Sequence, residues 1–106
     1  MIYAVLFVHF VADFMLQTDA MAKGKSTSNR WLSLHIAAYT APFILFGWRY
    51  AAVNGLSHFA IDYVSSRASS RMWKAGRVHD FFVVIGFDQF LHMAILIATI
   101  PLMGWP

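Results

Sequence analysis

The stretch "HFVADFMLQTD", residues 9–19, places a histidine and an aspartate inside an otherwise apolar segment. His9 and Asp13 are four residues apart, a spacing that brings two side chains to the same face of a helix. The same pair of residue types recurs in "HFAID", residues 58–62, and in reversed order in "DQFLH", residues 88–92. Three such pairs in one short chain predict a polar cluster that is shared between helices.

The composition around these pairs favours a membrane protein. Hydrophobic residues make up 59% of the 106 residues and charged residues only 12%, whereas about a quarter of a soluble domain is charged. A short chain exposes much surface for its volume, so this scarcity of charge disfavours the alternative of a small soluble helical protein. The chain contains no cysteine, which excludes disulfides and thiolate metal ligands, and its five acidic residues are all aspartates.

Apolar segments predict an all-α fold, a four-helix transmembrane bundle that forms a single integral membrane domain over residues 1–106. We expect helices at about 2–17, 31–46, 51–67 and 78–103, joined by polar linkers. "STSN", residues 26–29, offers N-cap side chains for the second helix. The first segment lacks a cationic start and a small-residue cleavage site, so we interpret it as a retained helix and not as a signal peptide.

The positive charges define the expected topology. Seven of the eight cations lie in the first and third linkers, which share one side of a four-span bundle. The positive-inside rule therefore places the basic linkers and the nearby polar cluster on the cytoplasmic side of a bacterial inner membrane, with both termini outside. A phage-encoded membrane protein is an alternative source. Expected partners are membrane lipids, a lipid-like substrate and further copies of the chain, whereas the absence of a basic helix face argues against nucleic acid.

The polar cluster predicts a metal site. An aspartate in a membrane costs about 2.5–3.5 kcal/mol unless its charge is offset. Imidazole and carboxylate groups are ordinary ligands of zinc, iron and manganese. We expect one or two divalent ions, with zinc preferred over iron or manganese, because this many ligands suit two ions better than one. The predicted ligands are His9, Asp13, His35, His58, Asp62, Asp88 and His92.

Other polar residues are expected around the ligands. Gln17, Gln89 and Asn54 are placed to orient ligands through hydrogen bonds. The basic residues of the linkers are expected to attract an anionic lipid head group; they are Lys23, Lys25, Arg67 and Arg71. Three alternatives remain open: a purely structural polar network, a proton or ion pathway, and one metal ion with a separate acid/base pair.

Five sequence elements in this order resemble a family of small bacterial and phage membrane proteins, the domain of unknown function 3307. The elements are "HFVADFMLQTD", the Lys23/Lys25 linker, His35, "HFAIDY" and "DQFLH". The resemblance implies a multi-span helical membrane protein. It also implies a lysine three residues after Asp62. This chain has Ser65 at that position, and Arg67 or Arg71 is expected to take the role of the lysine. The motif positions are His9, Asp13, Gln17, His35, His58, Asp62, Asp88, Gln89 and His92.

Two functions are compatible with this pattern. The first is a metal-dependent hydrolase that acts on a lipid or polyprenyl-phosphate-like substrate. The chain has no glutamate, so the H-E-x-x-H arrangement of zinc proteases is excluded. The alternative is a non-enzymatic phage or bacterial membrane protein for binding or assembly.

Overall fold

The computed structural model describes residues 1–104, which are almost entirely helical and contain no strand. The predicted all-α class is confirmed. Short turns join the helices, and three of the helix ends continue into a π or 3-10 turn. The α-helices are α1 (Ile2–Phe10), α2 (Asp19–Gly24), α3 (Asn29–Phe43), α4 (Trp48–Lys74) and α5 (Val78–Ala98), and the turns are Val11–Met15, Ile44–Phe46 and Ile100–Leu102.

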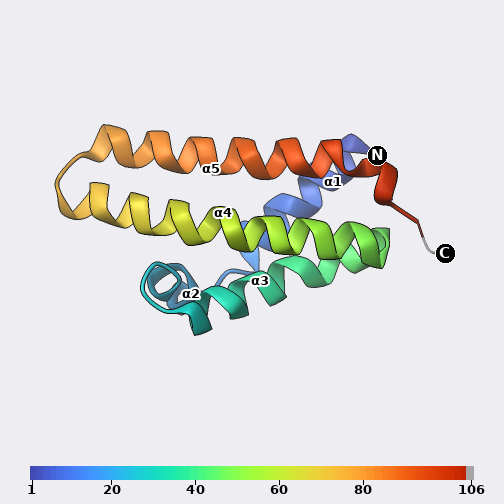
Figure 1. Ribbon diagram of the computed structural model, residues 1–106, viewed down its shortest axis with the longest axis horizontal. Coiled ribbons are helices and arrows are strands. Elements are labelled where there is room, and N and C mark those ends of the chain that lie inside the picture. Colours follow the sequence, from blue (N-terminus) through green and yellow to red (C-terminus); the bar gives the residue numbers. More distant parts are fainter. Residues whose placement is uncertain (105–106) are drawn as a thin grey trace.

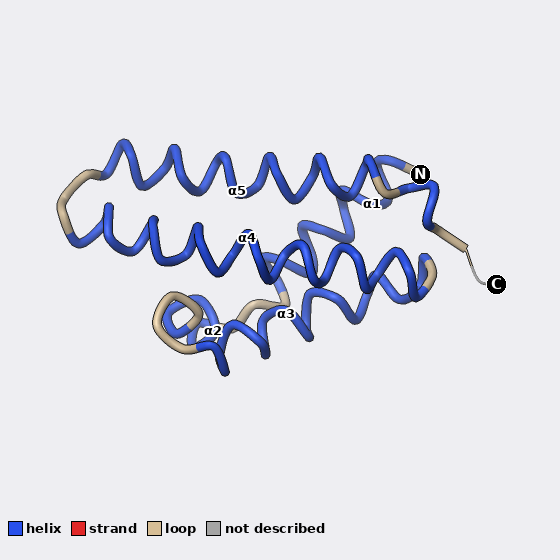
Figure 2. The backbone as a smooth tube through the Cα atoms, in the orientation of Figure 1, coloured by secondary structure: helices blue, strands red, loops and turns tan. Residues whose placement is uncertain are grey.

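The two longest helices, α4 and α5, form an antiparallel hairpin (Figures 1 and 2). Helix α3 packs along α4, and α1 lies against both α5 and α3. In Figure 1 the α4–α5 turn and α2 lie towards the left, whereas both chain ends and the α3–α4 connection lie towards the right. The two basic linkers therefore lie at the same end of the molecule, which is 48 Å long.

Helix α4 is longer than expected, because it continues to Lys74 and not only to residue 67. The segment expected to link the third and fourth helices, residues 68–77, contains alanine, arginine, methionine and lysine, all good helix formers, and no glycine before Gly76. Gly76 adopts a φ of 73°, a left-handed conformation that commonly ends helices. The basic side chains of residues 67–74 are thus carried on a rigid helix.

The other expected boundaries differ by a few residues. The first helix ends in a π turn at Met15, and the last α-helix ends at Ala98. The expected loop 18–30 contains α2, because the Thr18 side chain caps its N-terminus by accepting a hydrogen bond from the Met21 N–H. Ser28 caps α3 by accepting a hydrogen bond from the Trp31 N–H, which confirms the predicted N-cap stretch.

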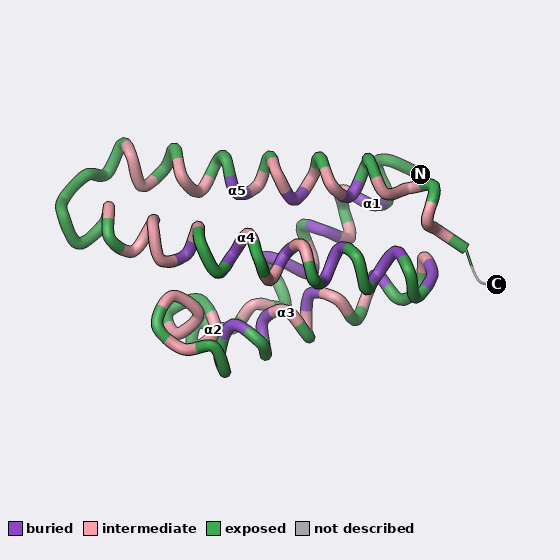
Figure 3. The backbone as a smooth tube through the Cα atoms, in the orientation of Figure 1, coloured by how far each residue is buried: buried purple, intermediate pink, exposed green. Residues whose placement is uncertain are grey.

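The buried positions, shown in Figure 3, form an apolar part and a polar part of the interior. Tyr39, Phe43, Tyr50 and Leu96 fill the apolar part, towards the end that carries the chain termini. The Tyr50 hydroxyl donates a 2.8 Å hydrogen bond to the Leu96 carbonyl, which ties α4 to α5. The polar part lies between this core and the basic linkers, and it contains the predicted ligands.

The outer surface is largely apolar. Within residues 1–104, α5 is the one helix that is long and apolar enough to cross a membrane by length and composition, and Ile2–Met15 forms a shorter apolar stretch. Helix α4 also exposes apolar side chains, including Leu56 (74% exposed) and Val64 (67%).

Candidate metal centre

Six of the seven predicted ligands meet in the polar interior, and four separate elements supply them. Asp13 comes from the π turn that follows α1, and His35 comes from α3. Helix α4 contributes His58 and Asp62, and α5 contributes Asp88 and His92. All six are buried, with at most 8% of the residue exposed. Each pair on α4 and α5 lies at i, i+4 spacing, and in each pair the imidazole Nε2 lies 3.2 Å from the carboxylate.

The first ligand set consists of Asp13, His35, His58 and Asp62. The Nε2 of His35 lies 3.2 Å from Asp13 Oδ1 and 3.1 Å from Asp62 Oδ2. The Nε2 of His58 lies 3.5 Å from Asp13 Oδ1 and 3.2 Å from Asp62 Oδ2. The two Nε2 atoms are 3.2 Å apart.

These spacings fit a four-coordinate metal ion. Zinc binds imidazole nitrogen and carboxylate oxygen at 2.0–2.1 Å, so the corners of its coordination tetrahedron lie about 3.3–3.4 Å apart. The five distances of the first set span 3.1–3.5 Å. The four side chains therefore converge with the spacing that a bound ion requires, and they can hold a metal ion.

The second ligand set consists of Asp62, Asp88 and His92. The Nε2 of His92 lies 3.4 Å from Asp62 Oδ1 and 3.2 Å from Asp88 Oδ2. Asp62 belongs to both sets, and it faces them with different oxygens, Oδ2 for the first and Oδ1 for the second. A carboxylate in this position can bridge two ions. The second set has three protein ligands, as catalytic zinc sites do.

His9 lies beside the two sets and belongs to neither. Its Nδ1 is 2.9 Å from the Tyr39 hydroxyl, and its Nε2 is 2.8 Å from Gln89 Oε1. The Nε2 is 3.9 Å from Asp13 Oδ2, which is too long for a hydrogen bond. The π turn widens the helix at Asp13, so that Asp13 Oδ1 faces His35 on α3. Widened turns of this kind are frequent at functional sites.

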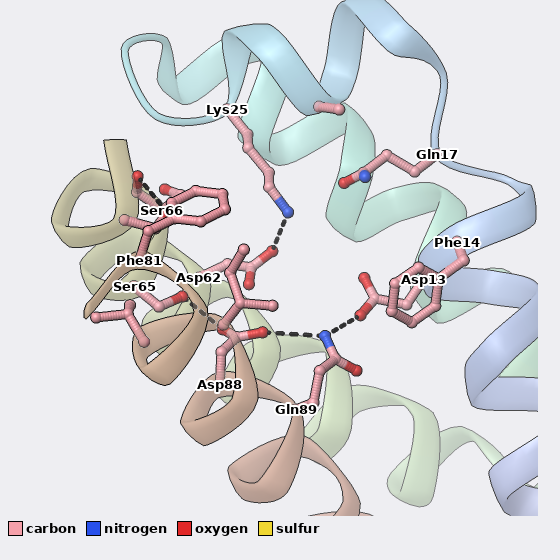
Figure 4. A pocket seen from close by; sticks show the side chains of 14 residues that line it. Asp13, Phe14, Gln17, Lys25, Asp62, Ser65, Ser66, Phe81, Asp88 and Gln89 are labelled. Carbon is pink, nitrogen blue, oxygen red and sulfur yellow. Dashed lines mark hydrogen bonds and ion pairs between the residues drawn. The ribbon is translucent and has the colours of Figure 1, made fainter. Parts of the chain in front are cut away.

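Gln89 links the carboxylates of the two sets, as Figure 4 shows. Its amide nitrogen donates to Asp13 Oδ2 at 2.9 Å and to Asp88 Oδ2 at 3.1 Å. Its amide oxygen contacts His9, so one side chain orients three of the predicted ligands. The sequence predicted that Gln89 lies beside the ligands and forms hydrogen bonds to them. Hydrogen bonds of this kind fix the orientation of metal ligands in proteins.

Lys25 approaches the same cluster from the connection between α2 and α3. Its Nζ lies 3.3 Å from Asp62 Oδ2, the oxygen that faces both histidines of the first set (Figure 4). Of the three buried carboxylates, only that of Asp62 contacts an ammonium group, so two negative charges remain without an offset when the imidazoles are neutral. Buried charge of this kind is costly unless it is paired or bound to a metal. A bound divalent cation would supply the missing charge.

One feature departs from the usual surroundings of metal-bound histidine. The Nδ1 atoms of His35 and His58 are buried without a hydrogen-bond partner among the residues that the structure describes. Metal-binding histidines almost always donate this N–H to an oxygen. Packing restrains the His58 ring instead: it stacks on the ring of His92 at a centroid distance of 3.8 Å, and the centroid of the Tyr39 ring lies 3.9 Å from that of His58.

A cavity of about 310 Å³ opens onto the cluster. The carboxylates of Asp13, Asp62 and Asp88 line it, together with Lys25 and Gln89 (Figure 4). The Ser65 hydroxyl also lines it, and it donates a hydrogen bond to Asp88 Oδ1. A ligand in the cavity thus has direct access to both ligand sets, including the second set with its three protein ligands.

The remaining predicted site residues lie farther out. Gln17 lines the cavity, whereas Asn54 donates to the Tyr50 carbonyl and to Thr99, away from the ligands. Lys23 lines a second cavity near the basic end. The Arg67 guanidinium lies on the Tyr63 ring and donates to Asn29, and Arg71 is exposed. The structure therefore brings Lys25, and none of the other three basic residues, to the carboxylates.

Two contacts at the site were not predicted, those of Tyr39 and of Lys25, although the spacing of Tyr39 in the sequence indicates its contact. Tyr39 follows His35 by four residues and so lies on the same face of α3, where it meets His9. Lys25 was expected to bind a head group, but it also pairs with Asp62. Its contact depends on how α2 folds back, and no periodic pattern encodes that.

Ser65 stands where the family resemblance implies a lysine. Neither Arg67 nor Arg71 reaches Asp62 in its place, whereas Lys25 does.

The chain belongs to the family described as "Protein of unknown function (DUF3307)", whose sequence model matches residues 1–105. The resemblance inferred from the motifs is confirmed. No curated protein and no solved structure matches the chain.

Proposed function

We propose that this protein is an integral membrane hydrolase with a two-ion centre, which cleaves a phosphate ester of a lipid-like alcohol. The observation that carries the proposal is the bridging position of Asp62 between two ligand sets. The first set would hold one ion through Asp13, His35, His58 and Asp62. The second would hold another through Asp62, Asp88 and His92. Zinc fits the mixture of imidazole and carboxylate ligands best, with iron and manganese as alternatives.

The proposed reaction is hydrolysis. The oxygen of a water molecule bonds to phosphorus, the bond between phosphorus and the alkoxy oxygen breaks, and a proton from that water passes to the leaving alkoxide, which departs as the alcohol. Two bound divalent ions supply Lewis acidity to such a displacement. The chain's own contribution is to orient the ligands through Gln89 and to place the Lys25 ammonium beside the cavity, where it attracts the phosphate.

We further propose that all four long helical segments cross a bacterial inner membrane, with the basic linkers in the cytoplasm. Both basic linkers lie at the same end of the fold, which supports this topology. Four polar residues of α4 are buried against other helices, namely Asn54, His58, Asp62 and Ser66, while Leu56 and Val64 are exposed apolar positions between its two ends. Such a helix can face lipid although its mean composition is not apolar.

Release of inorganic phosphate from a long-chain alkyl phosphate by purified protein tests the hydrolase. We expect turnover to stop when a chelator removes the ions and to return when zinc is added. Asp88→Asn should abolish turnover, whereas Asp80→Asn should retain it, because Asp80 lies near the surface and pairs with Arg77. Turnover that survives complete removal of metal would overturn the proposal.

A second candidate is a non-enzymatic protein for membrane binding or assembly. The contacts of Lys25 and Gln89 with the carboxylates favour it, because they hold the cluster together without any reaction. This candidate predicts a protein that keeps its fold without metal and shows no turnover on any phosphate ester.

A further inference from the structure

An apolar groove of about 350 Å³ runs between α4 and α5 on the outer side of the molecule. Apolar side chains form nearly all of its surface. Along α5 the groove spans eight residue steps, which is about 12 Å at 1.5 Å per residue. Its apolar lining consists of Ile61, Val64, Ala68, Val83, Phe87 and Leu91.

The groove adjoins the cavity at the candidate metal centre. Ser65, Val84 and Asp88 line both spaces. Asp88 is a member of the second ligand set, and the Ser65 hydroxyl donates to it across the α4–α5 contact. Figure 4 shows both side chains at the edge of the cavity, pointing towards each other. The apolar groove therefore ends at the second ligand set.

The opposite side of the cavity is polar and basic. It adjoins a second cavity of about 460 Å³, and Lys25 lines both. Lys23 and four serines complete the polar lining of the second cavity, namely Ser26, Ser66, Ser69 and Ser70. Ammonium and hydroxyl groups are the partners that a phosphate group requires. The three spaces thus pass from an apolar groove, through the ligand sets, to a cavity that combines ammonium and hydroxyl groups with the aromatic rings of Trp73, Phe81 and Phe82.

We propose that the groove receives the hydrocarbon chain of a phosphate ester and opens sideways to the membrane interior. The phosphate then lies in the cavity between the second ligand set and Lys25, and the chain lies along α4 and α5. This inference rests on the proposed function, and it specifies the substrate as a phosphate ester with a single hydrocarbon chain that enters between these two helices.

The test compares hexylphosphonate with methylphosphonate. In both probes a phosphorus–carbon bond stands in place of the ester bond, so the protein cannot hydrolyse them. Their binding to zinc-loaded protein in nanodiscs is followed by phosphorus NMR, and empty nanodiscs correct for partitioning. We expect hexylphosphonate to bind at least about tenfold more tightly, because burial of two methylene groups already suffices for that ratio. Ala68→Trp should fill the groove and remove the preference.

Leu56→Trp is the matched control, since Leu56 is an exposed residue of α4 that does not line the groove. It should keep the preference of the unmodified protein. Val83→Trp provides a second way to fill the groove if Ala68→Trp does not fold. Metal content is measured for every variant and should be unchanged.

Equal binding of the two probes to protein that retains its ions would overturn the inference alone, as would an unchanged preference in a folded, groove-filled variant. Absence of bound ions from the unmodified protein would overturn the proposed function and this inference together. The metal content therefore separates the two failures.

Discussion

Asp62 is the residue on which the candidate centre depends. It lies on α4 between α3 and α5, with one carboxylate oxygen facing each ligand set. It contacts three histidines and Lys25, and it is 2% exposed. A buried carboxylate with this many partners is expensive to alter, because removal of its charge leaves the partners uncompensated.

Substitution of Asp62 should affect both ions, whereas substitution of Asp88 should affect one. We expect Asp88→Asn to keep about one ion per chain and Asp62→Asn to hold fewer, because Asp62→Asn removes a ligand from both sets, whereas a four-ligand zinc site remains intact in Asp88→Asn. Elemental analysis of the purified variants measures this, with Asp80→Asn as the control. Equal losses in both variants would show that Asp62 does not bridge two sites.

Lys25 should weaken metal binding while it promotes phosphate binding. Its ammonium lies 3.3 Å from the Asp62 oxygen of the first set and so repels a cation there. We expect Lys25→Met to bind zinc about tenfold more tightly, since a change of this size needs only a modest Coulomb term. Competition with a zinc chelator measures the affinity. Lys23→Met is the control, because Lys23 is exposed, and a similar effect in that variant would refute a specific role for Lys25.

At the scale of elements, the sequence pattern predicts the pairs within a helix better than the contacts between helices. The i, i+4 spacing in "HFAID" and "DQFLH" places His58 against Asp62 and Asp88 against His92, as the structure shows. The pair His9/Asp13 is separated by the π turn, which the apolar pattern does not encode. The helical extension to Lys74 follows from helix-forming residues and not from an apolar period, and the return of Lys25 depends on tertiary packing, so periodicity could not predict either.

The close approach of α3 and α4 sets the geometry of the first ligand set. Gly55 permits it, because a Cβ there would lie 2.4 Å from the Thr40 hydroxyl oxygen. We expect Gly55→Leu to lower the free energy of unfolding by about 1–3 kcal/mol, as overpacking does, and to reduce metal content by moving His35 away from α4. Thermal unfolding and elemental analysis measure the two effects.

Gly86→Leu is the matched control for this change. Gly86 is also helical, but a Cβ at that position meets nothing within 4 Å. We expect this variant to be unchanged or stabilised by up to about 1 kcal/mol, because leucine has the higher helix propensity. Equal destabilisation at both positions would show that the α3–α4 contact is not the cause.

The whole molecule has an apolar core towards the chain termini and basic linkers at the opposite end, which Figure 1 shows by its labels, and the candidate centre lies between them. Helices α4 and α5 together carry four of the six converging ligands, and the groove between them reaches Asp88. This arrangement suits a substrate that is apolar at one end and anionic at the other.

The proposed topology places α2 and the α4–α5 turn on the same side of the membrane. Since the chain has no cysteine, single substitutions at exposed positions report sidedness directly. We expect Ala20→Cys and Ala75→Cys to react with a membrane-impermeant thiol reagent only from the cytoplasmic side, and Leu45→Cys only from the outside. Labelling of Ala20→Cys and Ala75→Cys from opposite sides would contradict the four-span arrangement.

The metal content of the unmodified protein tests the central claim most directly. Elemental analysis of protein purified in detergent, after exchange into metal-free buffer, gives the number of ions per chain. The two ligand sets that share Asp62 predict about two divalent ions per chain, with zinc foremost. A folded protein that contains no bound metal, and that takes up none when zinc is supplied, would contradict the account.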